Sequence, residues 1–243
     1  MGKIFFKKQG MYGQDDMYDQ MIIHTDILHR NNDNSGLVYG NFQKVLPLQK
    51  TINKILKRTL DLLVSVIIIA GILSWLVPVI ACVIKLTSKG PVFFTQKRNK
   101  KNGAVFNCIK FRTMIVNKEA DEKGAMKNDK RITPVGAFLR SKHLDELPQF
   151  FNVLIGDMSF IGPRPHMISE NIRNGKIIKS YNTRHNVKPG ITGLAQSLGY
   201  FGFTEEVEKL NERIKLDLYY INNWSVKMDF QIVLKTIKNL FRS

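Results

Sequence analysis

One segment limits the possible folds of this chain more than any other. From Leu62 to Ile84, 23 consecutive residues carry no charge. At about 1.5 Å per residue, a helix of this length crosses a hydrocarbon core of about 30 Å. The run starts well inside the chain and lacks a small-residue cleavage site, which excludes a signal peptide. A buried core helix is the alternative, but few soluble domains of this size can cover such a run on all sides, so the sequence predicts a membrane segment.

Basic residues flank this run at both ends, although a spanning helix is expected to have a basic excess on its cytoplasmic side only. Near the middle, Pro78 removes a backbone N–H and predicts a kink, and the Ser74 hydroxyl is a candidate partner for the carbonyl that is freed. A broken helix can enter the membrane and return to the same face. We favour this re-entrant interpretation, and a kinked spanning helix with the N-terminal tail outside is the alternative.

The chain divides into three predicted parts, and the fold class is α+β, mostly helical, with short strands. Residues 1–50 form a polar tail without a strong period, to which we assign no function. Residues 51–89 contain the membrane helix and, at 51–58, a basic amphipathic lead-in that suits a headgroup layer. Residues 90–243 form the remaining domain, with a strand at 105–113, loops at 156–165 and 188–193, and helices at 134–139, 144–154, 205–221 and 229–240; the segment 168–186 is expected to be helical in its first part.

The last of these helices alternates apolar and basic residues in the pattern of a helix that lies in a membrane interface. Packing on its own domain is an equal alternative. Lys and Arg total 37 against 20 Asp and Glu, a net charge of +17, which predicts an anionic partner: nucleic acid, anionic lipid or a phosphorylated substrate. With two cysteines, no CxxC and no HExxH, the sequence excludes a disulfide framework, a cysteine-built zinc site and a zinc protease.

Two adjacent acids, Asp145 and Glu146, open an apolar-periodic stretch. Neighbours on a helix point about 100° apart, so the two carboxylates should have separate tasks. An ionised carboxylate at a helix N-terminus can be a nucleophile or a Mg²⁺ ligand. The alternative is a first turn whose acids only complement the helix dipole.

Several basic residues accompany these acids. Arg164 lies between Pro163 and Pro165, which restrict the backbone and pre-position a guanidinium that suits a phosphate. In the segment KPGITG, proline and two glycines predict a tight loop where backbone can approach a ligand, or else a plain turn. The cations around a carboxylate pair, together with a membrane segment, predict an anionic substrate handled at the bilayer. The other basic candidates are Lys110, Arg112, Arg131 and Arg140.

Six ordered segments resemble one known family: KRTLDLLVS, KLTSKGPVFFTQ, KFRTM, LDELPQFFNVLIGDMSFIGPRP, KPGITGLAQ and LDLYYINNWS. They are similar to the bacterial sugar transferases, the monotopic polyprenyl-phosphate phosphoglycosyl transferases, over roughly residues 57–243. The run GPRPH and the segment EKLNERIKLDLYYINNWS resemble most the members that load glucose or galactose 1-phosphate onto undecaprenyl phosphate. Those members often have extra N-terminal membrane spans, whereas this chain resembles the short, single-anchor members.

The resemblance implies a mechanism. A UDP-sugar binds with Mg²⁺ at the cytoplasmic face of the bacterial inner membrane, and Asp145 attacks its β-phosphate and displaces UMP. Polyprenyl phosphate then takes the sugar phosphate from the enzyme, which begins the synthesis of a surface polysaccharide such as a capsule, an exopolysaccharide or lipopolysaccharide. Glu146 takes a supporting or metal-binding role beside Asp145. The residues implied to hold phosphates are Lys110, Arg140 and Arg164, with Arg112 and Arg131 as further candidates. A homo-oligomer stays open, and no nucleic acid is expected.

The chain departs from the family pattern at four positions. Trp75 follows Ser74 where proline is common, Leu194 replaces a usual Trp, Lys130 replaces a frequent Pro, and His143 replaces a small hydroxyl residue. Two other functions compete with the enzyme. A membrane-tethered protein that binds nucleic acid or anionic lipid would not place an acidic pair among its arginines, and a retired, inactive scaffold would not need intact DELPQ and GPRP runs.

Overall fold

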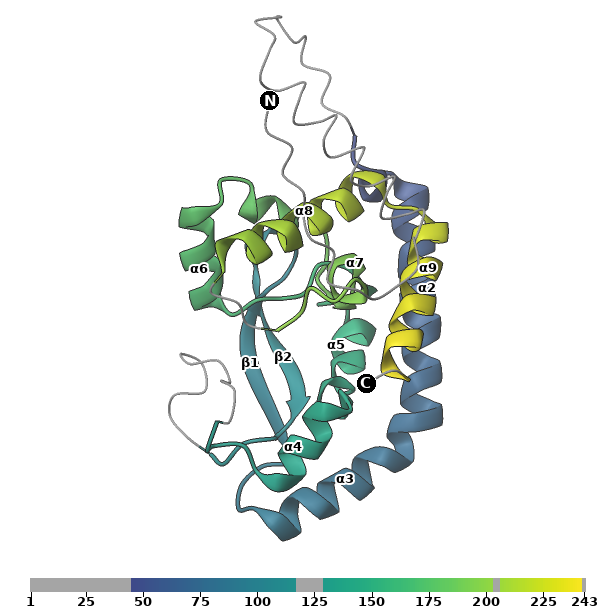
Figure 1. Ribbon diagram of the computed structural model, residues 1–243. Coiled ribbons are helices and arrows are strands. Elements are labelled where there is room, and N and C mark those ends of the chain that lie inside the picture. Colours follow the sequence, from purple (N-terminus) through teal and green to yellow (C-terminus); the bar gives the residue numbers. More distant parts are fainter. Residues whose placement is uncertain (1–44, 117–128, 203–205, 242–243) are drawn as a thin grey trace, which may run out of the picture. The chain divides into compact units, whose positions relative to one another are not determined.

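The computed structural model describes residues 45–116, 129–202 and 206–241, and from Val45 onward they form one unit. Most of the predicted polar tail and residues 117–128 lie outside the described residues. The fold is mostly helical, with two small two-stranded sheets, which confirms the predicted class (Figure 1).

The apolar run forms one long, interrupted helix. Helix α2 (Thr51–Ile68) leads through a π-helical turn (Ile69–Leu73) into α3 (Ser74–Thr87), and Figure 1 shows the chain changing direction between α2 and α3. The Ser74 hydroxyl donates to the Ala70 carbonyl over 2.7 Å and the Trp75 indole to the Gly71 carbonyl over 3.0 Å. The break thus lies one turn before Pro78, which is the place where a proline disturbs a helix. The Ser74 and Trp75 side chains bind the carbonyls of this interrupted turn.

The polarity of α2 is inverted relative to a soluble helix. Its buried residues are Lys57, Asp61 and Ser65, which are spaced four apart on one face, whereas apolar side chains such as Ile67, 66% exposed, face outward. Among the residues that the structure describes, Thr51–Thr87 is the one helix that is long and apolar enough to cross a membrane. Only 17% of its apolar 18-residue stretch is buried within the protein. A buried core helix is therefore excluded as the explanation of this run, and the exposed face suits lipid.

Two cations of the predicted basic lead-in, Lys57 and Arg58, bind the domain rather than facing outward. The Lys57 ammonium is buried and lies 2.7 Å from a carboxylate oxygen of Asp229 in α9 (Val226–Leu240). The Arg58 guanidinium donates to the carbonyls of Val153 and Leu154, over 2.6 and 2.8 Å, at the end of α5 (Gln149–Ile155). These two cations anchor the start of the long helix to the domain, whereas Lys54 and the apolar side chains of Ile52 and Ile55 remain exposed.

The far end of the long helix returns to the same domain. Ile80 and Ile84 of α3 pack against Phe111 of β2 (Val105–Phe111) and Leu139 of α4 (Pro134–Ser141). Strand β1 (Phe93–Asn99) pairs antiparallel with β2, and Figure 1 shows α3 running back under α4 toward this hairpin.

Two segments predicted as loops pair with each other. Strands β3 (Ser159–Ile161) and β4 (Gly190–Thr192) are parallel neighbours. A Cβ atom on Gly190 would lie 2.1 Å from the Gly162 nitrogen, and one on Gly193 would lie 2.2 Å from the Gly162 oxygen. The glycines of KPGITG therefore allow backbone to approach backbone, and the expected contact with a ligand is wrong for these two positions.

The predicted helix 144–154 is divided at Pro148. A 3-10 turn, η4 (Leu144–Glu146), comes first, and α5 starts at Gln149 because proline has no N–H to donate and suits a helix start. The remaining helices are α6 (Ile168–Ile177), α7 (Leu194–Ser197) and α8 (Val207–Asn223), with a further 3-10 segment at Tyr181–Asn186.

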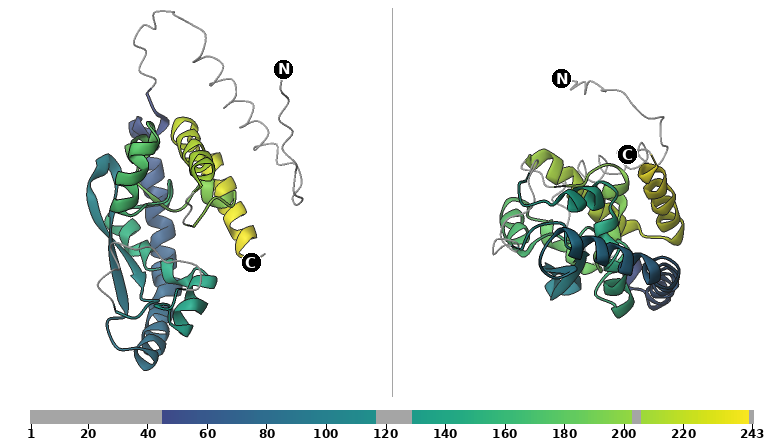
Figure 2. Two further views of the ribbon diagram at one scale, coloured as in Figure 1. Left: turned by 60° about the vertical axis from the view of Figure 1, so that its left-hand side comes forward. Right: turned by 90° about the horizontal axis from the view of Figure 1, so that it is seen from below.

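Helix α9 packs on its own domain and also keeps an exposed apolar face. Met228, Asp229 and Ile232 are buried, while Phe230 and Leu234 stay exposed, at 61% and 52%. One face therefore packs on the domain and the other presents apolar side chains outward. Figure 2 shows α9 on the opposite side of the unit from the β1–β2 hairpin.

Candidate active site

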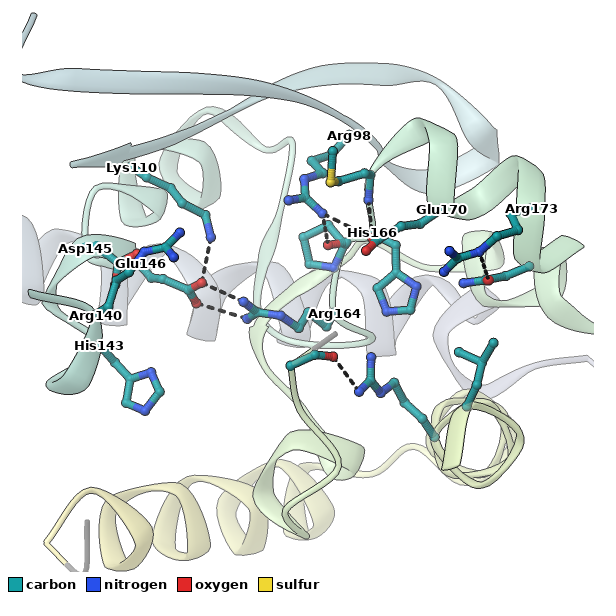
Figure 3. A pocket seen from close by; sticks show the side chains of 16 residues that line it. Arg98, Lys110, Arg140, His143, Asp145, Glu146, Arg164, His166, Glu170 and Arg173 are labelled. Carbon is teal, nitrogen blue, oxygen red and sulfur yellow. Dashed lines mark hydrogen bonds and ion pairs between the residues drawn. The ribbon is translucent and has the colours of Figure 1, made fainter. Parts of the chain in front are cut away.

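A polar cavity of about 330 Å³ collects most of the predicted site residues, and its size falls within the usual range of small-molecule sites (Figure 3). It is lined from β1, β2, α4, η4, α6, α8 and the segment that follows Gly162. Five of the seven predicted site residues line it: Lys110, Arg140, Asp145, Glu146 and Arg164.

Glu146 is held by two cations. Its Oε1 accepts from Lys110 Nζ and from Arg164 Nη2, both over 2.6 Å, and its Oε2 accepts from Arg164 Nη1 over 3.0 Å. Burial disfavours the charged carboxylate, but the charges of Arg164 and Lys110 outweigh burial and hold the pKa of Glu146 well below its ordinary value of 4.5. Glu146 is therefore ionised and fixes the two cations at the cavity wall.

Asp145 differs from its neighbour. Its side chain is buried, with 6% of the residue exposed, and it has no hydrogen bond or ion pair within the part of the chain that the structure describes. Burial raises the pKa of Asp145 above 3.8; the charge of Lys110 opposes this rise, and the charge of Glu146 adds to it. An unengaged, buried carboxylate near Lys110, Arg140 and Arg164 is the pattern of perturbed groups that is common at functional sites.

The local backbone separates the two acids. His143 adopts the left-handed conformation, with φ of 55°, and the acids follow in η4 before α5 begins. The sequence predicted that both acids occupy the N-terminus of a longer α-helix, and this prediction is wrong. Successive residues of a 3-10 turn point about 120° apart, so Asp145 and Glu146 take different surroundings, and the expected division of tasks agrees with this geometry.

Arg112 and Arg131, the other two predicted phosphate-binding residues, do not join the cavity. All three donor nitrogens of Arg112 bind backbone carbonyls just beyond α3, at residues 88, 89 and 91, over 2.5 to 2.9 Å. Arg112 thus satisfies carbonyls at a helix C-terminus. Arg131 pairs with Asp129 over 2.7 Å and does not line the cavity.

The other end of the cavity includes residues that the sequence did not single out. They are Arg98, His166, Glu170, Arg173, Asn174 and Arg213. Figure 3 shows Lys110, Asp145 and Glu146 at one end and Glu170 and Arg173 at the other, with Arg164 between them. His166 belongs to the GPRPH run, but α6 and α8 carry no local sequence pattern that marks their cavity-lining residues.

The donor set fits Mg²⁺ only together with substrate. Among the described residues, no three His, Cys, Asp or Glu side chains gather to hold a metal ion. Mg²⁺ is usually bound by one or two carboxylates, several waters and the phosphates of the substrate. Asp145 offers a free carboxylate near the cavity, whereas both oxygens of Glu146, the second predicted ligand, are occupied by Lys110 and Arg164.

Comparisons with known proteins point to one family. A family model described as bacterial sugar transferase matches residues 52–243. The chain is 50% identical over 188 residues to a UDP-glucose:undecaprenyl-phosphate glucose-1-phosphate transferase of Klebsiella pneumoniae, which covers 76% of this chain and 40% of that protein. It is 41% identical to a transferase of the same name from Caulobacter vibrioides, over 80% of this chain and 73% of that protein.

A third relative has another donor sugar in its name. The chain is 42% identical to a UDP-N-acetylgalactosamine-undecaprenyl-phosphate N-acetylgalactosaminephosphotransferase of Aeromonas hydrophila, over 79% of this chain and 45% of that protein. The chain thus spans less than half the length of the Klebsiella and Aeromonas proteins.

Proposed function

Because the chain belongs to the bacterial sugar transferase family, we propose that it transfers a hexose 1-phosphate from a UDP-sugar to undecaprenyl phosphate and releases UMP. One observation carries the proposal: Asp145 keeps an unengaged, buried carboxylate in a cavity that Lys110, Arg140 and Arg164 make positive. Such a carboxylate can act as a nucleophile toward phosphorus.

The proposed reaction has two displacements at one phosphorus atom. An Asp145 carboxylate oxygen bonds to the β-phosphorus, and the bond from that phosphorus to the bridging oxygen breaks, so that UMP leaves with the bridging oxygen. An oxygen of undecaprenyl phosphate then bonds to the same phosphorus and displaces the Asp145 carboxylate. The product is undecaprenyl-diphospho-sugar, and Asp145 is free again. A covalent intermediate lets a soluble and a lipid substrate use one site in turn.

The remaining residues at this end position and neutralise charge, which is most of what phosphoryl transfer requires of a protein. Glu146 keeps Lys110 and Arg164 beside Asp145, and Arg140 is restrained by a 3.0 Å hydrogen bond from its Nε to the Thr113 hydroxyl. When bound, Mg²⁺ would be held by Asp145 and the substrate phosphates and would neutralise phosphate charge.

Glucose is the first candidate for the transferred sugar, because it is named for the Klebsiella and Caulobacter relatives. A panel of UDP-glucose, UDP-galactose and UDP-N-acetylgalactosamine, each with undecaprenyl phosphate in detergent or nanodiscs, tests the function through UMP release. We expect the highest kcat/KM with UDP-glucose. If none of the three donors gives UMP, the proposal is wrong.

Removal of divalent cations is expected to stop this reaction. One carboxylate and the diphosphate of the substrate are the proposed ligands, so EDTA should abolish UMP release and added Mg²⁺ should restore it. The measurement is the initial rate of UMP release at a series of Mg²⁺ concentrations. An unchanged rate in EDTA would remove the metal from the mechanism.

The contacts of the long helix support a re-entrant, monotopic attachment, and we propose that the site lies on the cytoplasmic face. Its first part is tied to the domain through the Lys57–Asp229 ion pair, and its last part through Ile84 and the carbonyls that Arg112 binds. If the helix crossed the bilayer, its two ends would lie on opposite sides, and one polar domain cannot bind both. The basic residues before the helix are weaker support for this topology than these contacts, because Lys57 and Arg58 are engaged within the protein.

Cysteine labelling tests this topology. The background has Cys82 and Cys108 replaced by alanine. In this background, Lys50→Cys places an exposed thiol before the long helix in the sequence, and Ala104→Cys places one after it. We expect a membrane-impermeant maleimide to label both positions only after the cytoplasmic face is exposed, as in inverted vesicles. Labelling of the two positions from opposite faces would mean a spanning helix.

A further inference from the structure

The end of the cavity away from Asp145 is rich in hydrogen-bond donors that have no partner. We propose that this end, formed by Arg98, His166 and Arg213, binds the nucleotide half of the donor and then the leaving UMP, so that the sugar lies at the Asp145 end. The inference rests on the proposed function and assigns the two halves of its donor substrate to the two ends of one cavity.

The first observation concerns buried polar atoms. Six buried side-chain nitrogen or oxygen atoms in the described part of the chain have no hydrogen-bond partner. Three of them are Arg98 Nε, His166 Nε2 and Arg213 Nε, on residues that line this end, and a fourth is Nε of Arg184, which contacts His166. The three arginine Nε atoms are donors and the imidazole Nε2 donates in one of its tautomers; buried polar groups without partners are rare because each one costs free energy. An excess of donors predicts a ligand that supplies acceptors.

The second observation is uncompensated positive charge. Arg213 forms no ion pair within the described residues and donates only to the Gly202 carbonyl, over 2.8 Å. Arg98 approaches Glu170 at 3.9 Å, which is a loose pair. Burial, more than any neighbouring charge, lowers the pKa of both arginines, as expected for buried cations with too few anions nearby. An anionic ligand group would complete this site.

The third observation concerns the ring of His166. Its Nδ1 lies 2.6 Å from Arg184 Nη1 and 2.5 Å from the Tyr181 hydroxyl, so this nitrogen is fully engaged within the protein. Burial, and after it the charge of Arg184, lowers the pKa of His166 well below 6.5, and the ring is neutral. Nε2 is buried without a partner, so it is the ring nitrogen left for a ligand. Asp217, 2.7 Å from Arg184, holds that arginine in place.

The two halves of a UDP-sugar differ in what they require. The phosphates and the uracil carbonyls accept hydrogen bonds, whereas sugar hydroxyls both donate and accept. A wall with excess donors and positive charge fits the acceptor-rich nucleotide better than the sugar. The reacting β-phosphorus must lie at Asp145, so the nucleotide extends past Arg164 toward His166, and the sugar stays near the exposed His143 at the other end (Figure 3).

The test compares nucleotide affinity with sugar preference in variants of the full chain in nanodiscs. Arg213→Met removes the charge, and Arg213→Lys keeps it. The readouts are the inhibition constant of UMP, the KM and kcat for UDP-glucose, and the ratio of kcat/KM between UDP-glucose and UDP-galactose. Lys215→Met, on the same helix but exposed and paired only with Glu212, is the matched control and should change none of them.

We expect Arg213→Met to raise the UMP inhibition constant and the KM by a similar factor, about 10-fold or more, which is the usual effect of losing a charge-assisted hydrogen bond. Arg213→Lys should stay within about threefold, and the glucose-to-galactose ratio should change in neither variant. His166→Asn, whose shorter side chain has no polar atom at the Nε2 position, should also weaken UMP binding and gives a second variant if Arg213→Met does not fold.

Two results would overturn the assignment: UMP inhibition that is unaffected in both Arg213→Met and His166→Asn, or a changed sugar ratio with an unchanged UMP inhibition constant. Either result is distinct from failure of the proposed function, in which the unmodified protein would release no UMP from any donor.

Discussion

Replacing Asp145 with asparagine is expected to reduce UMP release by at least about 10⁴-fold, as the loss of a catalytic nucleophile commonly does. An amide cannot form the proposed bond to phosphorus, although it has nearly the same shape as the carboxylate. In the absence of undecaprenyl phosphate, the unmodified protein should release about one UMP per active site in a burst, and Asp145→Asn should show no burst. Full turnover by this variant would defeat the assignment of Asp145 as the nucleophile.

The same variant is expected to be more stable than the unmodified protein at neutral pH. Since burial raises the pKa of Asp145 above 3.8, the ionised carboxylate is less favourable in the folded chain than in the unfolded one. This cost is present above the raised pKa and disappears as the pH falls below 3.8, where both states are protonated. Asp145→Asn should therefore melt at a higher temperature at pH 7, and the difference should vanish in acid.

The control for both measurements is Asp157→Asn. Asp157 lies outside the cavity and pairs with Lys100 over 2.6 Å at the surface, so this variant should keep its activity and should not gain stability. A gain in stability together with a loss of activity at Asp145 alone would identify a residue retained for chemistry at a cost to folding.

The catalytic end of the cavity could be predicted from the sequence because most of its residues lie in short segments that are near one another in the chain. Asp145, Glu146 and Arg164 come from the adjacent runs LDELPQ and GPRP, so their types and spacing were visible in the sequence. The sequence could not show that Lys110 lines the cavity and Arg112 does not, because both occupy one face of the predicted strand. The strand ends at Phe111, and Arg112 then turns to the carbonyls after α3, a contact that depends on where a distant helix ends.

Other features could not be predicted from the sequence because they depend on contacts between segments far apart in the chain. The sequence shows Lys57 as one of several basic residues before an apolar run, but its partner Asp229 is 172 residues away. In the same way, the donors at the far end of the cavity come from β1, the GPRPH segment and α8, which only the folded chain brings together. The membrane run itself was recognisable because burial from water acts on the whole segment rather than on one contact.

Glu146→Gln is expected to have the opposite effect on stability from Asp145→Asn, although the two residues are neighbours. Glutamine offers one acceptor in place of the two carboxylate oxygens, and its amide N–H groups would face a donor of Lys110 or Arg164. Breaking a buried ion pair in this way costs about 3 to 5 kcal/mol, and we expect the lower end because Arg164 keeps 29% of its side chain exposed. Turnover should also fall, since both cations lose the group that positions them.

The pH dependence separates this effect from a general loss of packing. The pKa of Glu146 lies well below 4.5 in the folded protein, so its contribution to stability is complete above that value and is lost as the pH falls through the lower, folded pKa. The difference in unfolding free energy between the unmodified protein and Glu146→Gln, measured by denaturant titration in detergent, should therefore be constant near pH 7 and shrink in acid. Glu212→Gln, which breaks an exposed pair with Lys215 on α8, should change stability by less than about 0.5 kcal/mol. A cost at Glu146 as small as that at Glu212, or one that does not depend on pH, would mean that the carboxylate does not hold the two cations of the site.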